Sequence, residues 1–283
     1  MTPTPLSRPL PGPGLRRRGA LALPVAAWLG SLCTTGRAAG PVLLGGTGSG
    51  VAVLRRVLDG QAAPLSVVPN LGSGGGLKAL AAGRLDLAIA SRRPNDAERA
   101  AGLVEREVFR SHLVWAVNPG VPVRQATRAD LVALYQGRSA FWPDGQPVRL
   151  VLRPESDIDT QLLRALGPEM DEAVSAAGRR PGMTVALTDD ETALHIERIP
   201  GALGTVTLGL LLAQDRALPL LKVSDLPASA AALADGRYPL VKRFYLVTGA
   251  RPTPEAAAVL QAMASRAAVE RLAGLGCQAV GAA

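Results

Sequence analysis

Aromatic residues and histidines are scarce in this chain of 283 residues, and their scarcity excludes several kinds of site. Phe, Trp and Tyr make up 3% of the sequence, so Leu, Val and Ala must fill the interior. The two histidines, His112 and His195, belong to no cluster with the spacing of metal ligands. A zinc site and a Cys–His nucleophile pair are therefore not expected. We predict a protein without catalytic residues, metal or cofactor.

Acidic residues are missing from residues 1–38, which contain five arginines. The formal net charge of the whole chain is +8, and without those five arginines it falls to about +3. A nearly balanced chain with few aromatic residues is a poor candidate for binding nucleic acid. We therefore expect no nucleic acid among its partners.

Residues 1–38 have the order of an export signal. The basic cluster Arg16-Arg17-Arg18 precedes an apolar stretch from Ala20 to Leu32, which is too short to span a bilayer. Gly36-Arg37-Ala38 then places small residues at positions −3 and −1 of a cleavage site. We expect cleavage after Ala38, by the Sec or the twin-arginine (Tat) route, and a mature chain outside the cytoplasm. A disordered tail is the alternative.

Cysteine is as scarce as histidine, with only Cys33 and Cys277 in the chain. Cys33 follows Gly30-Ser31-Leu32, which is a poor lipoprotein box. If the export signal is removed, Cys277 is the only cysteine left, and an intramolecular disulfide is impossible. The stability of the mature chain must then come from its core.

A glycine-rich turn, Gly45–Gly50, separates an apolar run from a helical pattern that begins at Val51. Such a strand–turn–helix unit directs free backbone N–H groups and the positive end of a helix dipole at one point, which suits an anion. Thr47, Gly48 and Ser49 are the candidate donors. An ordinary βα turn is the alternative, and the spacing matches neither a P-loop nor a dinucleotide fingerprint.

Two further strand ends repeat this design. Gly72–Gly76 follows an apolar run and offers Ser73 and Gly74 as donors, and the strand expected over 84–90 ends at Ser91-Arg92. Three βα turns in sequence predict a parallel α/β sheet, in which ligands bind beyond the carboxyl ends of the strands. Arg92 is ambiguous, because it either contacts the ligand or pairs with an acidic residue.

Helix boundaries are marked farther along the chain. Asn95, Thr127 and either Thr188 or Asp189 are expected N-caps, and Pro254 is expected to open one last helix that runs to Leu272.

Over residues 41–280 the chain resembles the phosphate-type substrate-binding proteins of ABC importers, in the two-lobed periplasmic binding superfamily. The matching motifs occur in the family's order. They are the two glycine turns, Asp86–Arg92, Pro200–Gly204 and Tyr238–Thr248.

The resemblance implies an α/β fold of two lobes joined by two hinge crossings. Residues 39–117 plus 244–283 would form the first lobe and residues 118–243 the second. The crossings are expected after Val117 and at Phe244–Thr248.

The second lobe departs from the family pattern at the expected anion grip. Arg153 and Ser156 stand in the place of the Arg and Ser of the family's Arg-x-x-x-Ser-Gly-Thr, with only Pro154-Glu155 between them, and Asp157 replaces the glycine. Thr205 also stands where the family has Tyr. Arg153 would offer a bidentate charged contact to the anion. Asp157 either accepts a hydrogen bond from a protonated oxyanion or caps a helix through its carboxylate.

The function that the resemblance implies is capture without catalysis. The ligand would be phosphate or a similar oxyanion, held between the lobes of a monomeric periplasmic protein and delivered to an ABC transporter permease. Alternatives are binding or sensing of molybdate, tungstate or a small organic acid. An exported hydrolase of phosphate esters is a further alternative.

Overall fold

The computed structural model describes residues 40–60, 64–226 and 228–281. The predicted export signal and Cys33 lie outside the described residues. Among the described residues, no helix has both the length and the apolar character needed to cross a membrane.

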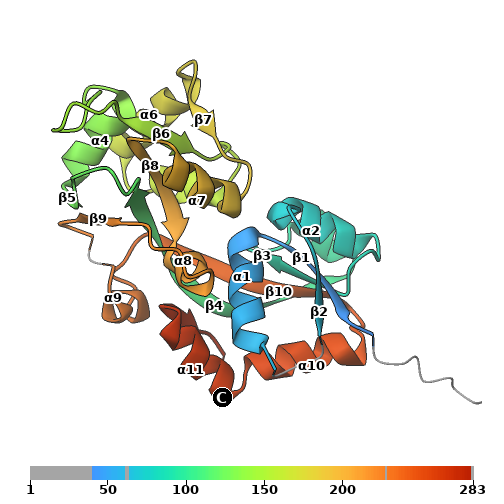
Figure 1. Ribbon diagram of the computed structural model, residues 1–283. Coiled ribbons are helices and arrows are strands. Elements are labelled where there is room, and N and C mark those ends of the chain that lie inside the picture. Colours follow the sequence, from blue (N-terminus) through green and yellow to red (C-terminus); the bar gives the residue numbers. More distant parts are fainter. Residues whose placement is uncertain (1–39, 61–63, 227, 282–283) are drawn as a thin grey trace, which may run out of the picture. The chain divides into compact units, whose positions relative to one another are not determined.

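The first three strands form the parallel unit that the glycine turns predicted (Figure 1). β1 (Val42–Gly46) pairs on one side with β2 (Leu65–Val68) and on the other with β3 (Leu87–Ala90). Their connections contain α1 (Gly48–Leu58) and α2 (Gly72–Ala81). Both helices begin inside the glycine-rich segments, earlier than the apolar pattern alone indicated, so backbone N–H groups of the turns belong to first helical turns.

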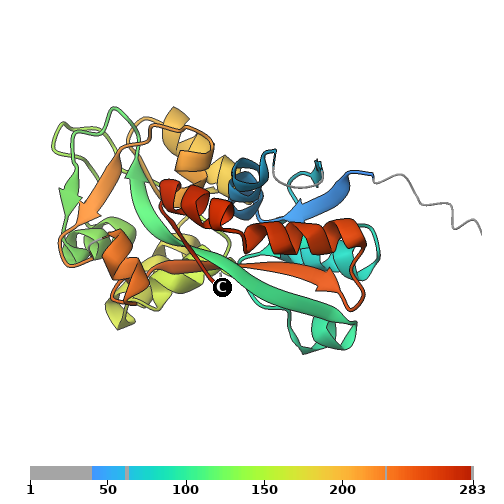
Figure 2. The same ribbon diagram turned by 90° about the horizontal axis from the view of Figure 1, so that it is seen from below.

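Two long antiparallel strands connect the halves of the sheet. β4 (Leu103–Val117) pairs with β10 (Val241–Gly249) over Leu103 to His112, and from Leu113 onward it pairs with β8 (Ala202–Thr207). Figure 2 shows β4 as a long green strand with β10 beside it. The partners of β4 therefore change near residue 112, inside the strand and before Val117.

The second half of the sheet is built around β8. The strand order over the described residues is β2-β1-β3-β10-β4-β8-β6-β7. β6 runs parallel to both β8 and β7, and β9 joins β4 to β5. The remaining strands are β5 (Gln125–Ala126), β6 (Arg149–Leu152), β7 (Thr184–Val185), β9 (Leu220–Val223) and β11 (Cys277–Ala279).

Helices pack against both halves of this sheet. Apart from α1 and α2 they are α3 (Asp96–Ala100), α4 (Arg128–Gln136), α5 (Ile158–Arg164), α6 (Pro168–Arg179), α7 (Asp189–Arg198), α8 (Leu208–Ala213), α9 (Ala230–Ala234), α10 (Pro254–Met263) and α11 (Arg266–Gly274). One prediction here is wrong, because the last helix breaks into α10 and α11. Ser265 caps the second of them by accepting from the Ala268 N–H group, so the chain turns where the pattern predicted a continuous helix.

Separate apolar cores form in the two halves, as two lobes require. Leu44, Leu54 and Phe244 are fully buried in one cluster around β1, α1 and β10. Leu131, Tyr135 and Leu203 are buried in another cluster around β8, α4 and α6. Aliphatic side chains dominate both clusters, as the composition required. The fold class predicted from the sequence is confirmed.

Candidate functional site

The position of the first glycine turn is fixed by the close packing of β1 against β3 and α2. Gly46 has φ +139°, and a Cβ there would lie 1.9 Å from the Ile89 carbonyl oxygen. A Cβ on Gly76 of α2 would lie 2.8 Å from the Gly46 Cα. Glycine at these two positions lets three elements approach, because any side chain would collide with backbone. The N-termini of α1 and α2 consequently open at the same edge of the sheet.

A cleft of about 420 Å³ lies at this edge. It brings together nine of the ten predicted site residues: Thr47, Gly48, Ser73, Gly74, Ser91, Arg92, Arg153, Ser156 and Asp157. The tenth, Ser49, is fully buried beside it, and its hydroxyl lies 3.4 Å from that of Thr47. The sequence therefore located the cleft from motifs that lie more than a hundred residues apart.

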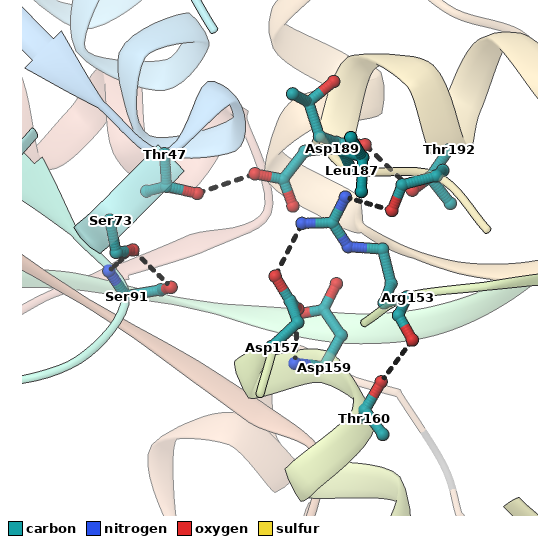
Figure 3. A network of polar contacts seen from close by, with 12 residues as sticks. Thr47, Ser73, Ser91, Arg153, Asp157, Asp159, Thr160, Leu187, Asp189 and Thr192 are labelled. Atoms are coloured by element: carbon teal, nitrogen blue, oxygen red, sulfur yellow. Dashed lines mark hydrogen bonds and ion pairs between the residues drawn. The ribbon is translucent and has the colours of Figure 1, made fainter. Parts of the chain in front are cut away.

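The first glycine turn is already bonded to a carboxylate, that of Asp189 at the start of α7 (Figure 3). Asp189 Oδ2 accepts from the Thr47 hydroxyl at 2.6 Å, the Ser49 hydroxyl at 3.0 Å and the Ser49 N–H at 3.1 Å. Asp189 is 5% exposed and Thr47 4%. Thr47 and Ser49, which the sequence predicted as donors to a bound anion, thus donate to a carboxylate of the chain itself.

A buried lysine compensates the charge of Asp189. Lys242 of β10 is 1% exposed and its Nζ lies 2.7 Å from Asp189 Oδ1 and 2.8 Å from Asp159 Oδ1. Burial favours the neutral form of Asp189, but the charges of Lys242 and Arg153 outweigh burial and hold its pKa well below the usual range. At Asp159 burial outweighs Lys242 and raises the pKa to about 6.

Arg153 lies at the end of β6 with a side chain only 6% exposed. It donates to Asp157 Oδ2 at 2.6 Å and to the Ala186 carbonyl at 3.1 Å, while its Nε has no partner among the described residues. Asp157 Oδ1 also accepts from the Asp159 N–H at 2.9 Å and so caps α5. The capping interpretation of Asp157 is confirmed, and the same carboxylate neutralises Arg153.

The second and third turns meet on the opposite wall of the cleft. The Ser91 N–H donates to the Ser73 hydroxyl at 3.0 Å, and the two hydroxyls lie 3.0 Å apart. Arg92 pairs with Glu98 through both terminal nitrogens, at 2.7 and 2.9 Å. Arg92 therefore has the acidic partner that one of its two interpretations predicted, and because it also lines the cleft, ligand contact by Arg92 stays a prediction. The first N–H groups of α2 have no intrahelical partner and no side-chain cap.

The walls of the cleft carry a small excess of negative charge. Arg92 and Arg153 face three carboxylates, those of Asp157, Asp189 and Asp190. Lys242 and Asp159 lie behind the walls, and their opposite charges cancel each other. Anion binding here must therefore rely on neutral N–H and O–H donors more than on net charge.

Sequence reasoning missed Lys242 and the roles of Asp159 and Asp189. Asp189 did appear as a helix-cap candidate, but Thr188 is the N-cap, accepting from the Glu191 N–H at 3.1 Å. Lys242 lies directly after Tyr238–Val241, yet nothing in that segment marks it as buried. Lys242 is the second residue of β10 and is followed by the exposed Arg243, so the sequence offers no signal that separates the buried cation from its exposed neighbour.

An α/β protein with two cores, and a cleft of hydroxyl and N–H donors at the ends of parallel strands, belongs to the class of two-lobed binding proteins. The family described as PBP superfamily domain matches residues 34–267, and the chain belongs to this family. No curated protein sequence matches the chain.

Solved structures share the fold. A protein assigned as a phosphate ABC transporter substrate-binding protein from Clostridium perfringens, determined with bound phosphate, is 17% identical with a TM-score of 0.69, over 85% of this chain and 100% of that one. A phosphate-binding protein from Stenotrophomonas maltophilia is 14% identical with a TM-score of 0.66, over 87% and 92%. An ABC-type phosphate transport receptor from Vibrio cholerae is 19% identical with a TM-score of 0.57, over 84% and 99%.

Proposed function

We propose that the chain is an exported, monomeric solute-binding protein without catalytic activity, which captures phosphate or a similar oxyanion in its cleft and delivers it to an ABC transporter permease. The observation that carries the proposal is the arrangement of donors. The N-terminus of α2 and the hydroxyls of Ser73 and Ser91 face Arg153 across the cleft. The phosphate ligands named for the similar folds support the same ligand class.

Neutral donors suit this task. An oxyanion removed from water needs many hydrogen bonds, and N–H and O–H groups supply them without a second desolvated charge. We assign the ligand contacts to Ser73, Gly74 and Ser91 on one wall and to Arg153 and Ser156 on the other. Arg92 lines the same wall as Ser91 and is paired with Glu98, as Arg153 is paired with Asp157, so either guanidinium would add a contact to the ligand beside its carboxylate partner.

Binding between two lobes would change their arrangement, and the permease could recognise the ligand-bound, closed form. Among the described residues we place the first lobe in 40–112 plus 244–281 and the second in 113–243. The crossing from the first to the second then falls inside β4, where its partners change, five residues before the boundary at Val117 that the sequence predicted. A ligand that touches both walls favours the closed arrangement, because it makes more contacts there than in the open one. Hinge closure of this kind is general for periplasmic binding proteins.

Calorimetry on the mature chain tests the proposal. Phosphate, sulfate, molybdate, tungstate and small organic acids would each be titrated into residues 39–283, expressed without the export signal. Saturable heat from phosphate supports the proposal, and saturable heat from another anion alone reassigns the ligand. Hydrolysis of a chromogenic phosphate ester by the same sample would contradict a protein without catalysis.

A further inference from the structure

The Asp189 carboxylate has the surroundings of a bound oxyanion. Its Oδ2 accepts three hydrogen bonds from Thr47 and Ser49, and its Oδ1 accepts from the Lys242 ammonium. All four residues are no more than 5% exposed. A phosphate oxygen in a glycine turn is held by the same kinds of donor, N–H and O–H groups at a helix N-terminus.

The position of Asp189 is determined by two helices whose N-termini approach each other. α7 begins at Asp189, and a capping box between Thr188 and Glu191 fixes its first turn. A Cβ on Gly48, in the first turn of α1, would lie 2.5 Å from Asp190 Oδ2. Two positive helix ends thus lie close together, and the Asp189 carboxylate stabilises both.

Among the residues that the structure describes, no other side chain caps α1. Thr47 is its N-cap residue, yet the Thr47 side chain accepts no capping hydrogen bond from the helix. The Ser49 N–H, which is orphaned at a helix start, instead finds its acceptor 140 residues away in Asp189. The Ser49 N–H and the hydroxyls of Thr47 and Ser49 are therefore satisfied without any external anion.

We propose that Asp189 is a built-in ligand of the first glycine turn, so that the chain occupies this anion site itself and confines a free oxyanion to the second and third turns. The inference rests on the proposed function only in saying where phosphate binds. Its core, a site filled by the protein's own carboxylate, concerns Thr47, Ser49 and Asp189 alone.

Formate tests the inference, because it is the smallest free carboxylate. In Asp189→Ala the emptied turn is expected to bind formate with saturable heat and an affinity at least about tenfold above that of wild type, since several charge-assisted hydrogen bonds become available. Adding Thr47→Val and Ser49→Ala to this variant should abolish the gain.

Asp190→Ala is the matched control. It removes one carboxylate from the same cleft, but Asp190 bonds to Gln214 at 2.6 Å and not to the turn. An equal gain of formate binding in Asp190→Ala would overturn the inference, because relief of charge alone would then explain it. Equal formate affinity in wild type and Asp189→Ala would overturn it as well.

Folding of the variant provides a second readout. If Asp189→Ala is unfolded in chloride buffer, formate at the same ionic strength should restore the circular dichroism of the wild type, and failure to do so would contradict the inference. Phosphate titration of the wild type tests the proposed function separately. If the wild type binds no phosphate but Asp189→Ala gains formate binding, the proposed function is refuted and the inference about Asp189 stands.

Discussion

Thr47 and Asp189 are 142 residues apart in the sequence and joined by a hydrogen bond of 2.6 Å. The bond ties the first glycine turn to the N-terminus of α7, and Lys242 of β10 completes the contact from the far side of the carboxylate. Three segments that no sequence motif connects thus meet in one buried polar cluster. Because the cluster fills the first glycine turn and borders the cleft, it bears on stability and on the binding that we propose.

Replacing Ser73 by alanine should weaken phosphate binding about ten- to a hundredfold. Ser73 offers its hydroxyl at the second turn, and a lost hydrogen bond to a charged ligand typically costs about 1.5–3 kcal/mol. Calorimetry measures the change, with Ser224→Ala, an exposed serine outside the cleft, as the control. An unchanged affinity in folded Ser73→Ala would remove this serine from the site.

Asp157→Asn should raise phosphate affinity, by roughly tenfold. The change removes a negative charge beside the cleft and frees the Arg153 guanidinium from its 2.6 Å contact. The asparagine oxygen still accepts from the Asp159 N–H, so the cap of α5 survives. Asp171→Asn breaks a comparable pair with Arg164 outside the cleft. Equal affinities in the two variants would show that Asp157 does not restrain Arg153.

Lys242→Met should lower the free energy of unfolding by about 3–5 kcal/mol, because it leaves buried carboxylates without their cation. Urea denaturation followed by circular dichroism measures the loss. Lys222→Met is the control, since Lys222 is exposed on β9. If both variants lose equally little, the buried ammonium does not stabilise the fold.

Stability should fall as the pH rises from about 4 to about 6, because of Asp159. Its pKa is raised to about 6 in the folded state by burial, whereas an unfolded aspartate has a pKa of about 3.9. In this window the folded state binds the extra proton, so raising the pH destabilises it. Asp189, with its lowered pKa, contributes in the opposite sense, and its contribution is lost only as the pH falls below about 3.9.

Urea denaturation at a series of pH values tests the role of Asp159. The variant Asp159→Asn cannot titrate and should lack the fall between about pH 4 and 6. A profile identical to wild type would assign the pH dependence to other groups.

The exported protein should begin at Ala39. The prediction rests on the basic, apolar and small residues that succeed one another in residues 1–38. Mass spectrometry of the protein secreted by cells that express the full chain measures the N-terminus. An intact Met1 or a lipidated Cys33 would contradict it.

Much of the fold follows from local sequence. Alternation of apolar runs with glycine turns predicts parallel βα units, and each predicted cap at Asn95, Thr127 and Thr188 completes a capping box in the structure. These features depend on residues within a few positions of one another, which is why the sequence alone reveals them. The cleft could also be predicted, because carboxyl ends of parallel strands always share one edge of the sheet.

Contacts between residues that lie far apart in the sequence could be identified only from the tertiary structure. The sequence predicted Thr47 and Ser49 as donors to an anion, but it did not reveal that the Asp189 carboxylate accepts their hydrogen bonds. It also did not reveal that Lys242 is buried against two carboxylates. Burial of a charge depends on which elements pack around it, and here those elements lie 53 to 142 residues apart. No local pattern carries that information, because the desolvation and the pairing that set these charges arise only when the sheet and the helices come together.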